Sequence, residues 1–417
     1  MSATGGVAPP RFGSAVPNLI GFSRDILGLF QGAARHGHDV VQVVLVPGLR
    51  LYFVNHPELI REVIATRRDQ FSKPQGLGDV RPAVGENLQT LDGSMHARHR
   101  QLAEPMMAPP SVASYAGEVV GQGVRSRDSW LEGTIDLHRQ ILETVLARAQ
   151  RYNLPVGPLL DMLPLASTKK MRRGRARAER FIDEMIRRER AANDPGHSLL
   201  AMLLASEPPD GSGALSDGEV RDEALFLFLA GWETIGDALT WTFYELARNP
   251  EAQERLQAEV DEVLGGEPAT LEHIARLPFV GAVINEALRL YAVGWGMLRQ
   301  AVGSQQLGPY RIPAKSYVLV SPFVTHRDER WFPGPENFVP ERWEGPRQEF
   351  VARPFFPFSI GPRTCLGEHF ASMALPLLVA TMAQRWTFHS ASPKPVQPVP
   401  QFALRPKGGL RLRVSRR

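Results

Sequence analysis

Near its C-terminal end the chain reads Phe358-Ser-Ile-Gly-Pro-Arg-Thr-Cys-Leu-Gly367, followed by an apolar helical pattern. Cys365 is the single cysteine, and a lone cysteine is most often an inert core residue. Here the thiol precedes a helix, whose N-terminal N–H groups and positive dipole end stabilise a thiolate. Gly361 permits a tight turn and Gly367 lets the backbone approach a flat ligand, while Arg363 can pair with a carboxylate. The stretch therefore predicts a thiolate that binds a metal beside a flat, acidic ligand.

The composition is that of an ordinary folded enzyme. Of 417 residues, 43% are hydrophobic and 22% are charged, close to globular averages. One cysteine excludes an intrachain disulfide and any zinc or iron–sulfur site built from several thiolates, although one thiolate can still bind haem. Because neither a repeat nor a break in composition marks a linker, we expect one domain over residues 1–417.

The N-terminal segment resembles neither a signal peptide nor a membrane anchor, since Pro9, Pro10 and Pro17 interrupt it and charged residues are mixed into it. The densest apolar runs elsewhere, Ala224–Gly231 and Met373–Ala383, are far shorter than the roughly 18 residues of a membrane helix. We therefore expect a cytoplasmic protein that has no membrane contact.

A net charge of +4 and the basic run Lys169–Arg190 raise the question of nucleic-acid binding. Acidic residues interleave with the arginines of this run, and apolar residues recur in it at helical spacing: Ala178, Phe181, Ile182 and Met185. This pattern is typical of an amphipathic helix with a solvated charged face. We expect no nucleic-acid partner.

Strand patterns are few and short. Val40–Val46 and Leu51–Val54 flank a Pro-Gly turn and predict a hairpin, and Tyr310–Ile312 with Ser316–Val320 look similar. Long helical patterns separate these runs. The sequence therefore favours a mostly helical fold with little β structure.

One helix is expected to be unusually long. Ser216 and Glu219 form a capping box, and the helical pattern from Asp217 to Arg248 ends at Asn249-Pro250. At about 1.5 Å per residue this helix is about 48 Å long, enough to cross the molecule. The preceding loop is predicted at Glu207–Ser216, which is rich in proline and glycine. The middle of the helix is apolar on all sides, so a buried central element is expected.

The ten residues 358–367 resemble the haem-binding signature of the cytochrome P450 family, Phe-x-x-Gly-x-Arg-x-Cys-x-Gly, with every fixed position present. Further family motifs occur in the right order along nearly the entire chain. The resemblance implies a mostly α fold with a small β-rich lobe near the N-terminus. It also implies haem b, iron protoporphyrin IX, with Cys365 as the iron ligand and Phe358, Arg363 and Gly367 beside it.

Two motifs matching the family imply a structural ion network. Glu286-Ala-Leu-Arg289 is similar to the Glu-x-x-Arg motif, whose spacing places both side chains on one helix face. Phe338-Val-Pro-Glu-Arg-Trp343 is similar to the meander segment, in which Arg342 joins the pair. We interpret this trio as support for the haem-side core and not as catalytic.

Ala230-Gly-Trp-Glu-Thr234 resembles the oxygen-activation motif of the central helix, with Ala230 and Thr234 facing the haem. Glu233 and Thr234 are the expected catalytic residues, which relay protons to dioxygen. Alternatively, the Thr234 hydroxyl only bonds back to the Ala230 carbonyl and bends the helix. Trp232 departs from the family's usual residue and is expected to point away from the haem.

His96-Ala-Arg-His-Arg100 resembles the segment whose first histidine and last arginine bind the haem propionates, and Arg299 matches another propionate-binding arginine. The alternative for each is a surface cation. The resemblance also implies a pocket lined by Phe226, Ala230, Gly294, Trp295 and Gly296. Between Leu142 and Pro164 the chain is shorter than the family by about one helix.

The function implied is insertion of one oxygen atom from O2 into a lipophilic small molecule, by hydroxylation, epoxidation or oxidative coupling. A separate ferredoxin or flavodoxin with its reductase is expected to supply electrons, because no flavin or nicotinamide motif precedes Cys365. Arg98 is expected to border the proximal haem face and to attract such a carrier. Three alternatives stay open: a non-catalytic haem-thiolate protein that binds a ligand or carrier protein, a peroxide-driven peroxygenase, and a cysteine hydrolase.

Overall fold

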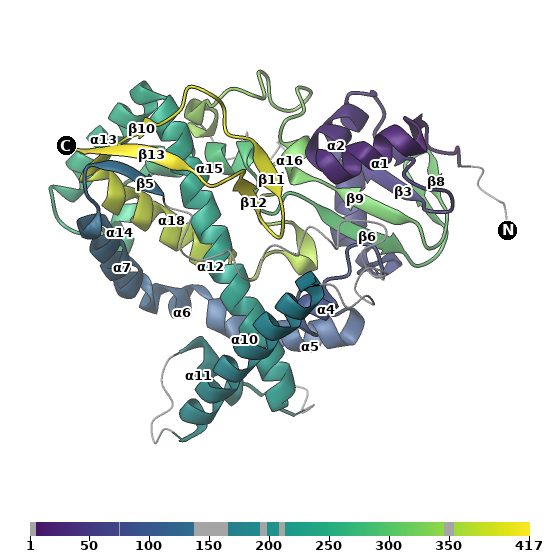
Figure 1. Cartoon of the computed structure of the whole chain (residues 1–417), viewed down its shortest axis with the longest axis horizontal. Coiled ribbons are helices and arrows are strands. Elements are labelled where there is room, and N and C mark those ends of the chain that lie inside the picture. Colours follow the sequence, from purple (N-terminus) through teal and green to yellow (C-terminus); the bar gives the residue numbers. More distant parts are fainter. Residues whose placement is uncertain (1–5, 75, 137–165, 192–197, 208–212, 346–353) are drawn as a thin grey trace.

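The computed structural model describes residues 6–74, 76–136, 166–191, 198–207, 213–345 and 354–417. Helices form most of the molecule, and the strands collect toward the end that carries the N-terminus and along the C-terminal edge (Figure 1). The mostly helical fold with small sheets is thus confirmed. The short region at 142–164 lies outside the described residues, as does the side chain of Trp232.

The described helices are α1 (Ala15–Arg24), α2 (Ile26–Ala34), α3 (Pro57–Arg61), α4 (Arg81–Val84), α5 (Gly93–Ala103), α6 (Pro109–Ser114), α7 (Ala116–Ser129), α10 (Ala166–Ala191), α11 (Leu199–Ala205), α12 (Asp217–Arg248), α13 (Pro250–Leu264), α14 (Leu271–Ile274), α15 (Pro278–Leu290), α16 (Pro322–Thr325) and α18 (Glu368–Ala383). Short helical turns are η1 (Glu62–Thr66), η2 (Arg68–Gln70), η3 (Glu104–Met107), η5 (Pro340–Trp343) and η6 (Gly361–Arg363).

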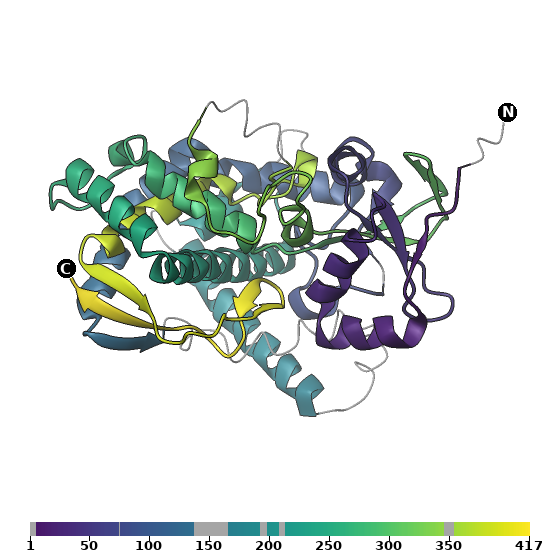
Figure 2. The ribbon, with the colours of Figure 1, turned by 90° about the horizontal axis from the view of Figure 1, so that it is seen from above.

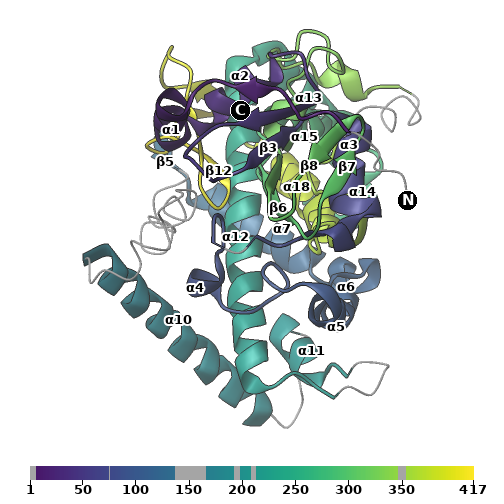
Figure 3. The same cartoon turned by 90° about the vertical axis from the view of Figure 1, so that its right-hand side faces the viewer.

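Helix α12 runs through the middle of the molecule, with other elements on every side of its central part (Figures 2 and 3). Its bounds are those predicted, and the Ser216–Glu219 capping box is present in both directions. Of the predicted loop Glu207–Ser216, the described residues 207 and 213–216 lie outside helices and strands. Trp241 and Leu246 are fully buried in the largest core, which α12 shares with α15 and α18. The helix is therefore a rigid support for any site along its length.

The described strands are β1 (Arg11–Phe12), β2 (Val40–Val43), β3 (Leu51–Val54), β4 (Phe71–Ser72), β5 (Gly133–Asp136), β6 (Met297–Ala301), β7 (Gln305–Leu307), β8 (Tyr310–Ile312), β9 (Tyr317–Val320), β10 (Trp386–Ser390), β11 (Pro398–Pro400), β12 (Leu404–Pro406) and β13 (Arg411–Arg416). Six of them form one sheet in the order β1-β2-β3-β9-β6-β4, and the others form sheets β10-β13-β5, β11-β12 and β7-β8.

The first predicted hairpin is confirmed, because β2 and β3 pair antiparallel. The second is wrong in its pairing. Strands occur at Tyr310–Ile312 and Tyr317–Val320, but β8 pairs with β7, whereas β9 lies between β3 and β6 in the large sheet. The buried apolar β9 gains more from the interior of a sheet than from a local hairpin. Strand β6, which pairs with β9, carries Arg299.

The predicted ion network is present and buried. Arg289 donates from Nε and Nη2 to the two carboxylate oxygens of Glu286, each over 2.8 Å, and Arg342 Nε donates to Glu286 Oε1 over 3.3 Å. Neither Glu286 nor Arg289 is exposed to solvent. Trp343 Nε1 also donates to Glu286, over 2.9 Å. The network fastens α15 to η5, as its structural interpretation requires.

Helix α10 is amphipathic, but its buried stripe matches the predicted one only at Ile182. Ile182 and Ile186 are buried, whereas Phe181 and Met185 are exposed to 61% and 39%. The adjacent apolar positions permit two registers, and packing against α11 and α12 selects the second. Arg188 and Glu184 pair across the solvated face, as on an ordinary charged helix surface. Among the described helices, none combines the length and apolar content of a membrane span.

Candidate active site

A cavity of about 470 Å³ lies between α12 and the loop before α18. Its wall includes nearly all of the predicted site and pocket residues: His96, Arg100, Phe226, Ala230, Thr234, Gly294, Trp295, Gly296, Arg299, Phe358, Arg363, Cys365 and Gly367. These residues come from segments up to about 270 positions apart in the chain. One predicted site residue, Glu233, is not part of the wall.

The loop that carries Cys365 is tightly turned. Cys365 N donates to Phe358 O over 2.8 Å, and Gly361 has φ of 77°. A Cβ atom at Gly361 would lie 2.5 Å from Cβ of Ala65, so only glycine fits where this loop packs on η1. The glycine of the motif is therefore required by packing as well as by the turn.

The Cys365 thiol opens onto the cavity and is accessible from it. Desolvation by the surrounding walls nevertheless raises the pKa of the thiol, although a hydrogen bond from the backbone of Gly367 acts in the opposite direction. The sequence interpretation expected the helix N-terminus to stabilise the thiolate. In the protein alone the hydrogen bond from Gly367 is present, but burial has the larger effect on the pKa of the thiol. A bound cation is therefore needed to favour the thiolate.

Basic side chains gather at one side of the cavity. His96, Arg299 and Arg363 all line it. Burial, with the nearby charges of Arg363 and Lys73, lowers the pKa of His96 to about 3. Burial and Arg363 lower the pKa of Arg299 to about 10. Arg299 and Arg363 thus lie close enough to repel one another in a desolvated place, a cost that an anionic ligand would offset, while burial and the charge of Arg363 keep His96 neutral.

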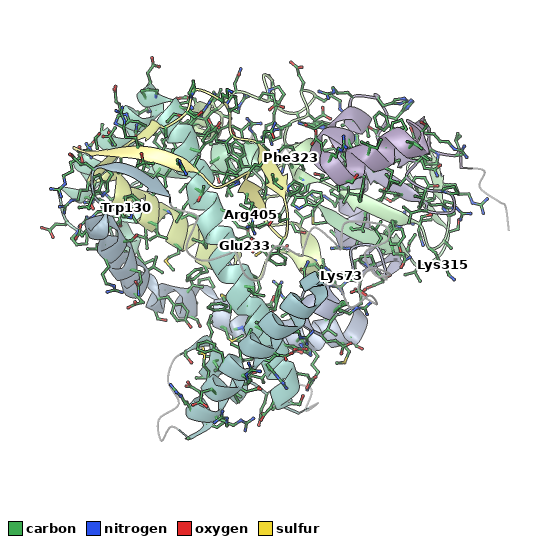
Figure 4. The ribbon with its side chains drawn as sticks, in the orientation of Figure 1. Lys73, Trp130, Glu233, Lys315, Phe323 and Arg405 are labelled. Carbon is green, nitrogen blue, oxygen red and sulfur yellow. The ribbon has the colours of Figure 1, made fainter. Side chains whose placement is uncertain are left out.

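Lys73 belongs to the same cluster and was missed by the sequence analysis. It lines the cavity, and burial together with Arg299 and Arg363 lowers its pKa well below the ordinary value. Strand β4 pairs antiparallel with β6, Ser72 opposite Gln300, which places Lys73 beside Arg299. Figure 4 shows Lys73 near the middle of the molecule. No local motif marks this lysine, since a pairing of distant strands brings it to the site.

Asp92 provides partial charge compensation. Its carboxylate accepts hydrogen bonds from Arg363 Nη2 and from the backbone N–H of Lys73. Arg363 Nη2 also donates to Leu91 O over 2.9 Å. One carboxylate balances only part of the charge of the cluster, so the site retains the capacity to bind an acidic group.

Arg100 and Arg98 lie on α5 and face different ways. Arg100 Nη1 donates to Thr364 O over 2.6 Å, and its Nε to Glu104 over 2.9 Å, next to the Cys365 loop. Arg98 instead donates to Glu219 Oε1 over 3.0 Å and to the carbonyls of Gly213 and Ala214, at the start of α12. Arg98 is thus held at the start of α12, and its expected role in carrier docking stays a prediction.

On α12 the hydroxyl of Thr234 donates to Ala230 O over 2.6 Å, as in the structural alternative. Thr234 also lines the cavity, so the bond does not remove it from the site. Glu233 is 2% exposed and accepts a hydrogen bond from Arg405 Nη2 over 2.8 Å. Consecutive residues project about 100° apart on a helix, which explains why Thr234 faces the cavity and Glu233 faces β12.

The cavity wall fits a flat, doubly acidic ligand that carries a metal. A Cβ atom at Gly231 would meet nothing within 4 Å, and one at Gly294 would lie 3.9 Å from its nearest neighbour. These surfaces leave room for a plane beside α12. The cationic cluster suits two carboxylates, and the accessible thiol lies on the same cavity wall, in the loop before α18. This combination fits haem, with its propionates at the cations and its iron at sulfur.

Comparison with known proteins agrees with this geometry. Residues 119–412 match the family model described as "Cytochrome P450". "Cyclooctatin synthase" of Streptomyces melanosporofaciens is 33% identical over 400 residues, covering 88% of this chain and 87% of that protein. "Cyclooctat-9-en-7-ol 5-monooxygenase" of the same organism is 33% identical over 84% of this chain and 82% of that protein.

"Pentalenene oxygenase" of Streptomyces avermitilis is 28% identical, covering 94% of this chain and 93% of that protein. A solved structure of a cytochrome P450, CYP102L1, superposes with a TM-score of 0.80 at 23% identity, covering 99% of this chain and all of that one. That likeness shows the fold. With the motif, the cavity and the family match together, the chain belongs to the cytochrome P450 family and is a haem-dependent monooxygenase of that family.

Proposed function

We propose that this protein inserts one oxygen atom from O2 into a terpenoid-type lipophilic molecule and acts in secondary metabolism. The observation that carries the proposal is the joint wall of one cavity, which combines Cys365, the cationic cluster, Thr234 and an apolar pocket. The names of the relatives support the substrate class, since they refer to cyclooctatin, cyclooctat-9-en-7-ol and pentalenene.

The cofactor in this proposal is haem b. Cys365 binds its iron, while His96, Arg100, Arg299 and Arg363, with Lys73 beside them, bind the propionates. Phe358, Ala230 and Gly367 lie on the cavity wall and would contact the macrocycle. Bound in this way, a haem with a thiolate ligand supplies the capacity to cleave the O–O bond.

Thr234 is assigned the transfer of protons at its Oγ1 atom. In the structure this atom donates to Ala230 O, and rotation about χ1 would release it toward a water in the cavity. A hydroxyl can both accept and donate a proton-bearing hydrogen bond, so it can pass a proton without becoming charged. After its ion pair with Arg405 opens, the Glu233 carboxylate would take up a proton from solvent and pass it to this hydroxyl.

The substrate pocket is assigned to Phe226, Ala230, Gly294, Trp295 and Gly296, as predicted from the sequence. Leu227, Ile235, Val293 and Phe402 extend the same wall. Most of these side chains are apolar, which favours a hydrocarbon skeleton, because burial of its surface is favourable by about 25 cal/mol per Å². The position that is oxidised depends on how the skeleton lies in this pocket.

Electrons are proposed to come from a separate ferredoxin or flavodoxin with its reductase. We further propose that residues 1–417 act as one catalytic domain in the cytoplasm, without a nucleic-acid or membrane partner. The peroxygenase and the non-catalytic binder remain alternatives to be excluded by experiment. The presence of Thr234 on the cavity wall favours the monooxygenase, since neither alternative requires a hydroxyl there.

A labelling experiment tests the function. The purified protein, a ferredoxin, its reductase and NADPH are incubated under ¹⁸O2 with a panel of terpene hydrocarbons and alcohols. Products that contain one ¹⁸O atom are expected by mass spectrometry. Oxidation only with added hydrogen peroxide would instead support the peroxygenase, and binding without oxidation of any panel member would support the non-catalytic protein.

A further inference from the structure

A stacked pair of aromatic rings lies in the core between α12 and the end of α15. The ring planes of Trp241 and Tyr291 differ by 1°, and the two centroids are 3.9 Å apart. Aromatic pairs in proteins usually keep about 4.5 to 7 Å between centroids and prefer offset or edge-on arrangements. Because two rings in such close, parallel contact are well coupled electronically, an electron can pass between them.

Both rings belong to residues that follow the cavity wall by about one helical turn. Ala238 of α12 lines the cavity, and Trp241 comes three positions later in the same helix. Leu288 of α15 also lines the cavity, and Tyr291 comes three positions later, at the end of that helix. One turn of helix rises by about 5.4 Å. The pair is therefore near enough to the cavity to exchange an electron with an oxidant formed there.

The phenol of Tyr291 has a proton acceptor beside it. Its hydroxyl donates to Glu245 Oε1 over 2.7 Å, and Glu245 is only 6% exposed. Burial raises the pKa of Glu245, although the hydrogen bonds from Tyr291 and Asn249 lower it, so the carboxylate is a better base than an exposed one. Burial and Glu245 raise the pKa of Tyr291, so the phenol keeps its proton until an electron leaves the ring.

Joint loss of an electron and a proton avoids a buried positive charge on Tyr291. With Glu245 ionised, transfer of the phenol proton to it leaves both side chains neutral once the electron has gone. A radical cation in the core would be expensive, and Arg327, 5.5 Å from the Tyr291 ring centroid, would disfavour it further. Arg327 keeps a carboxylate of its own, since it donates to Glu336 over 3.2 Å. Electron loss from Tyr291 is thus tied to Glu245.

The neighbouring rings lack such an acceptor. Trp241 Nε1 donates to Leu404 O over 2.8 Å, and a backbone carbonyl is too weak a base to take up its proton. Tyr244 packs edge-on against the two rings, at 5.6 and 6.0 Å. Its hydroxyl accepts from Val396 N over 3.1 Å, and no carboxylate is bonded to it among the described residues. An electron vacancy therefore passes through Trp241 and settles on Tyr291.

We propose that Trp241 and Tyr291, with Glu245 as proton acceptor, form a second redox site, which drains oxidising equivalents from the cavity when no substrate is bound. The oxidant is dioxygen reduced to the level of peroxide, which the monooxygenase chemistry of the family supplies. One electron leaves Tyr291 through Trp241 to the oxidant, the O–H bond of Tyr291 breaks, and its proton moves to Glu245.

A soluble thiol restores the site. An electron from the thiol and the proton held by Glu245 regenerate the O–H bond of Tyr291, and a second passage delivers the second electron. The O–O bond breaks, and the oxygen leaves as water with two protons from solvent. In balance, two thiols and one hydrogen peroxide give one disulfide and two waters. The site protects the cavity and its cofactor from oxidation, whatever the substrate class.

Electron paramagnetic resonance after rapid freezing tests the proposal on haem-loaded protein mixed with hydrogen peroxide in the absence of substrate. The parent protein should give a tyrosyl radical, identified by the altered hyperfine pattern when ring-deuterated tyrosine is incorporated. Tyr291→Phe keeps the stacked ring and removes the hydroxyl, so most of the signal should disappear. Tyr244→Phe is the matched control, because it removes a buried hydroxyl of the same cluster that has no carboxylate partner, and it should keep the signal.

Loss of the Soret band under peroxide is the second measurement. Tyr291→Phe should bleach severalfold faster than the parent, whereas Tyr244→Phe should bleach at the parent rate. Added thiol should slow bleaching in the parent and have less effect in Tyr291→Phe. Glu245→Gln keeps a hydrogen-bond acceptor but loses the base, so the yield of radical should fall. The carbon-monoxide spectrum checks the folding of each variant.

A parent protein without a tyrosyl signal, an undiminished signal in Tyr291→Phe, or an equal loss in Tyr244→Phe would overturn the inference. Equal bleaching of Tyr291→Phe and the parent would do so as well. None of these outcomes bears on the proposed terpenoid oxidation, which the ¹⁸O2 experiment tests separately.

Discussion

Glu233 and Arg405 form an ion pair, 2.8 Å from Oε1 to Nη2, that joins the middle of the central helix α12 to the hairpin of β11 and β12. Both side chains are largely buried, at 2% and 13% exposure. Figure 4 labels the two residues at the middle of the molecule. Glu233 directly precedes Thr234, which faces the cavity, and Arg405 follows four positions after Gln401. The pair therefore links the residue before Thr234 to the hairpin whose turn lies on the cavity wall.

Removal of the arginine should destabilise the protein. Arg405→Met is expected to lower the free energy of unfolding by about 3 kcal/mol, because a buried carboxylate loses its charged partner. The double variant Glu233→Gln/Arg405→Met should recover a large part of the loss, since no charge remains. Urea unfolding followed by circular dichroism measures both. Lys407→Met, at an exposed position after the same hairpin, is the control and should stay within about 0.5 kcal/mol of the parent. Equal losses at 405 and 407 would argue against a buried ion pair.

Thr234→Ala should uncouple electron consumption from substrate oxidation. The variant loses the hydroxyl that passes protons, whereas the cavity changes little in shape, so product formed per NADPH should fall about tenfold while peroxide rises. Thr234→Ser should keep most of the coupling. Thr240→Ala is the matched control, because its hydroxyl makes the same bond to a carbonyl four residues earlier, Gly236 O at 2.7 Å, and is buried away from the cavity. Equal coupling in the two alanine variants would leave Thr234 with a structural role only.

The sequence predicted elements whose signals are local. The capping box and Asn249-Pro250 predicted both ends of α12, and the motif around Cys365 predicted the turn before α18. It failed where distant segments decide the outcome. Lys73 reaches the cations through pairing of β4 with β6, and Arg405 reaches Glu233 through docking of the hairpin on α12. In α10 two apolar registers were available, and only the neighbouring helices select between them.

Glu219 should make stability depend on acidic pH. Burial opposes ionisation, but hydrogen bonds from Ser216 and Arg98 prevail and hold the pKa of Glu219 at about 2, below the ordinary 4.5. Between these values the unfolded chain binds a proton that the folded chain does not. Its contribution is therefore complete above about pH 4.5 and is lost as pH falls toward 2, by no more than about 3 kcal/mol. Glu219→Gln should flatten the stability profile between pH 5 and 3. A parallel profile would show that Glu219 is not responsible.

Electron delivery should require separate proteins. Turnover is expected only when a carrier and its reductase are both added, and activity with NADPH alone would contradict this. For docking, Arg68 is tested beside Arg98, since the Arg68 side chain is 43% exposed and the residue follows η1, which packs against the Cys365 loop. Arg68→Glu should slow reduction by an acidic ferredoxin at low ionic strength, and the difference should disappear as salt screens the charges. Arg98→Gln should have a smaller effect on this salt dependence.

The central claim is that Cys365 holds the haem iron through its thiolate, and the carbon-monoxide difference spectrum of the reduced protein tests it most directly. The parent protein should show the red-shifted Soret band of thiolate ligation, at a haem content near one per chain. Cys365→Ser should lose that band, because no other cysteine is present in the chain. A Cys365→Ser protein that retains haem and the same red-shifted band would contradict the account.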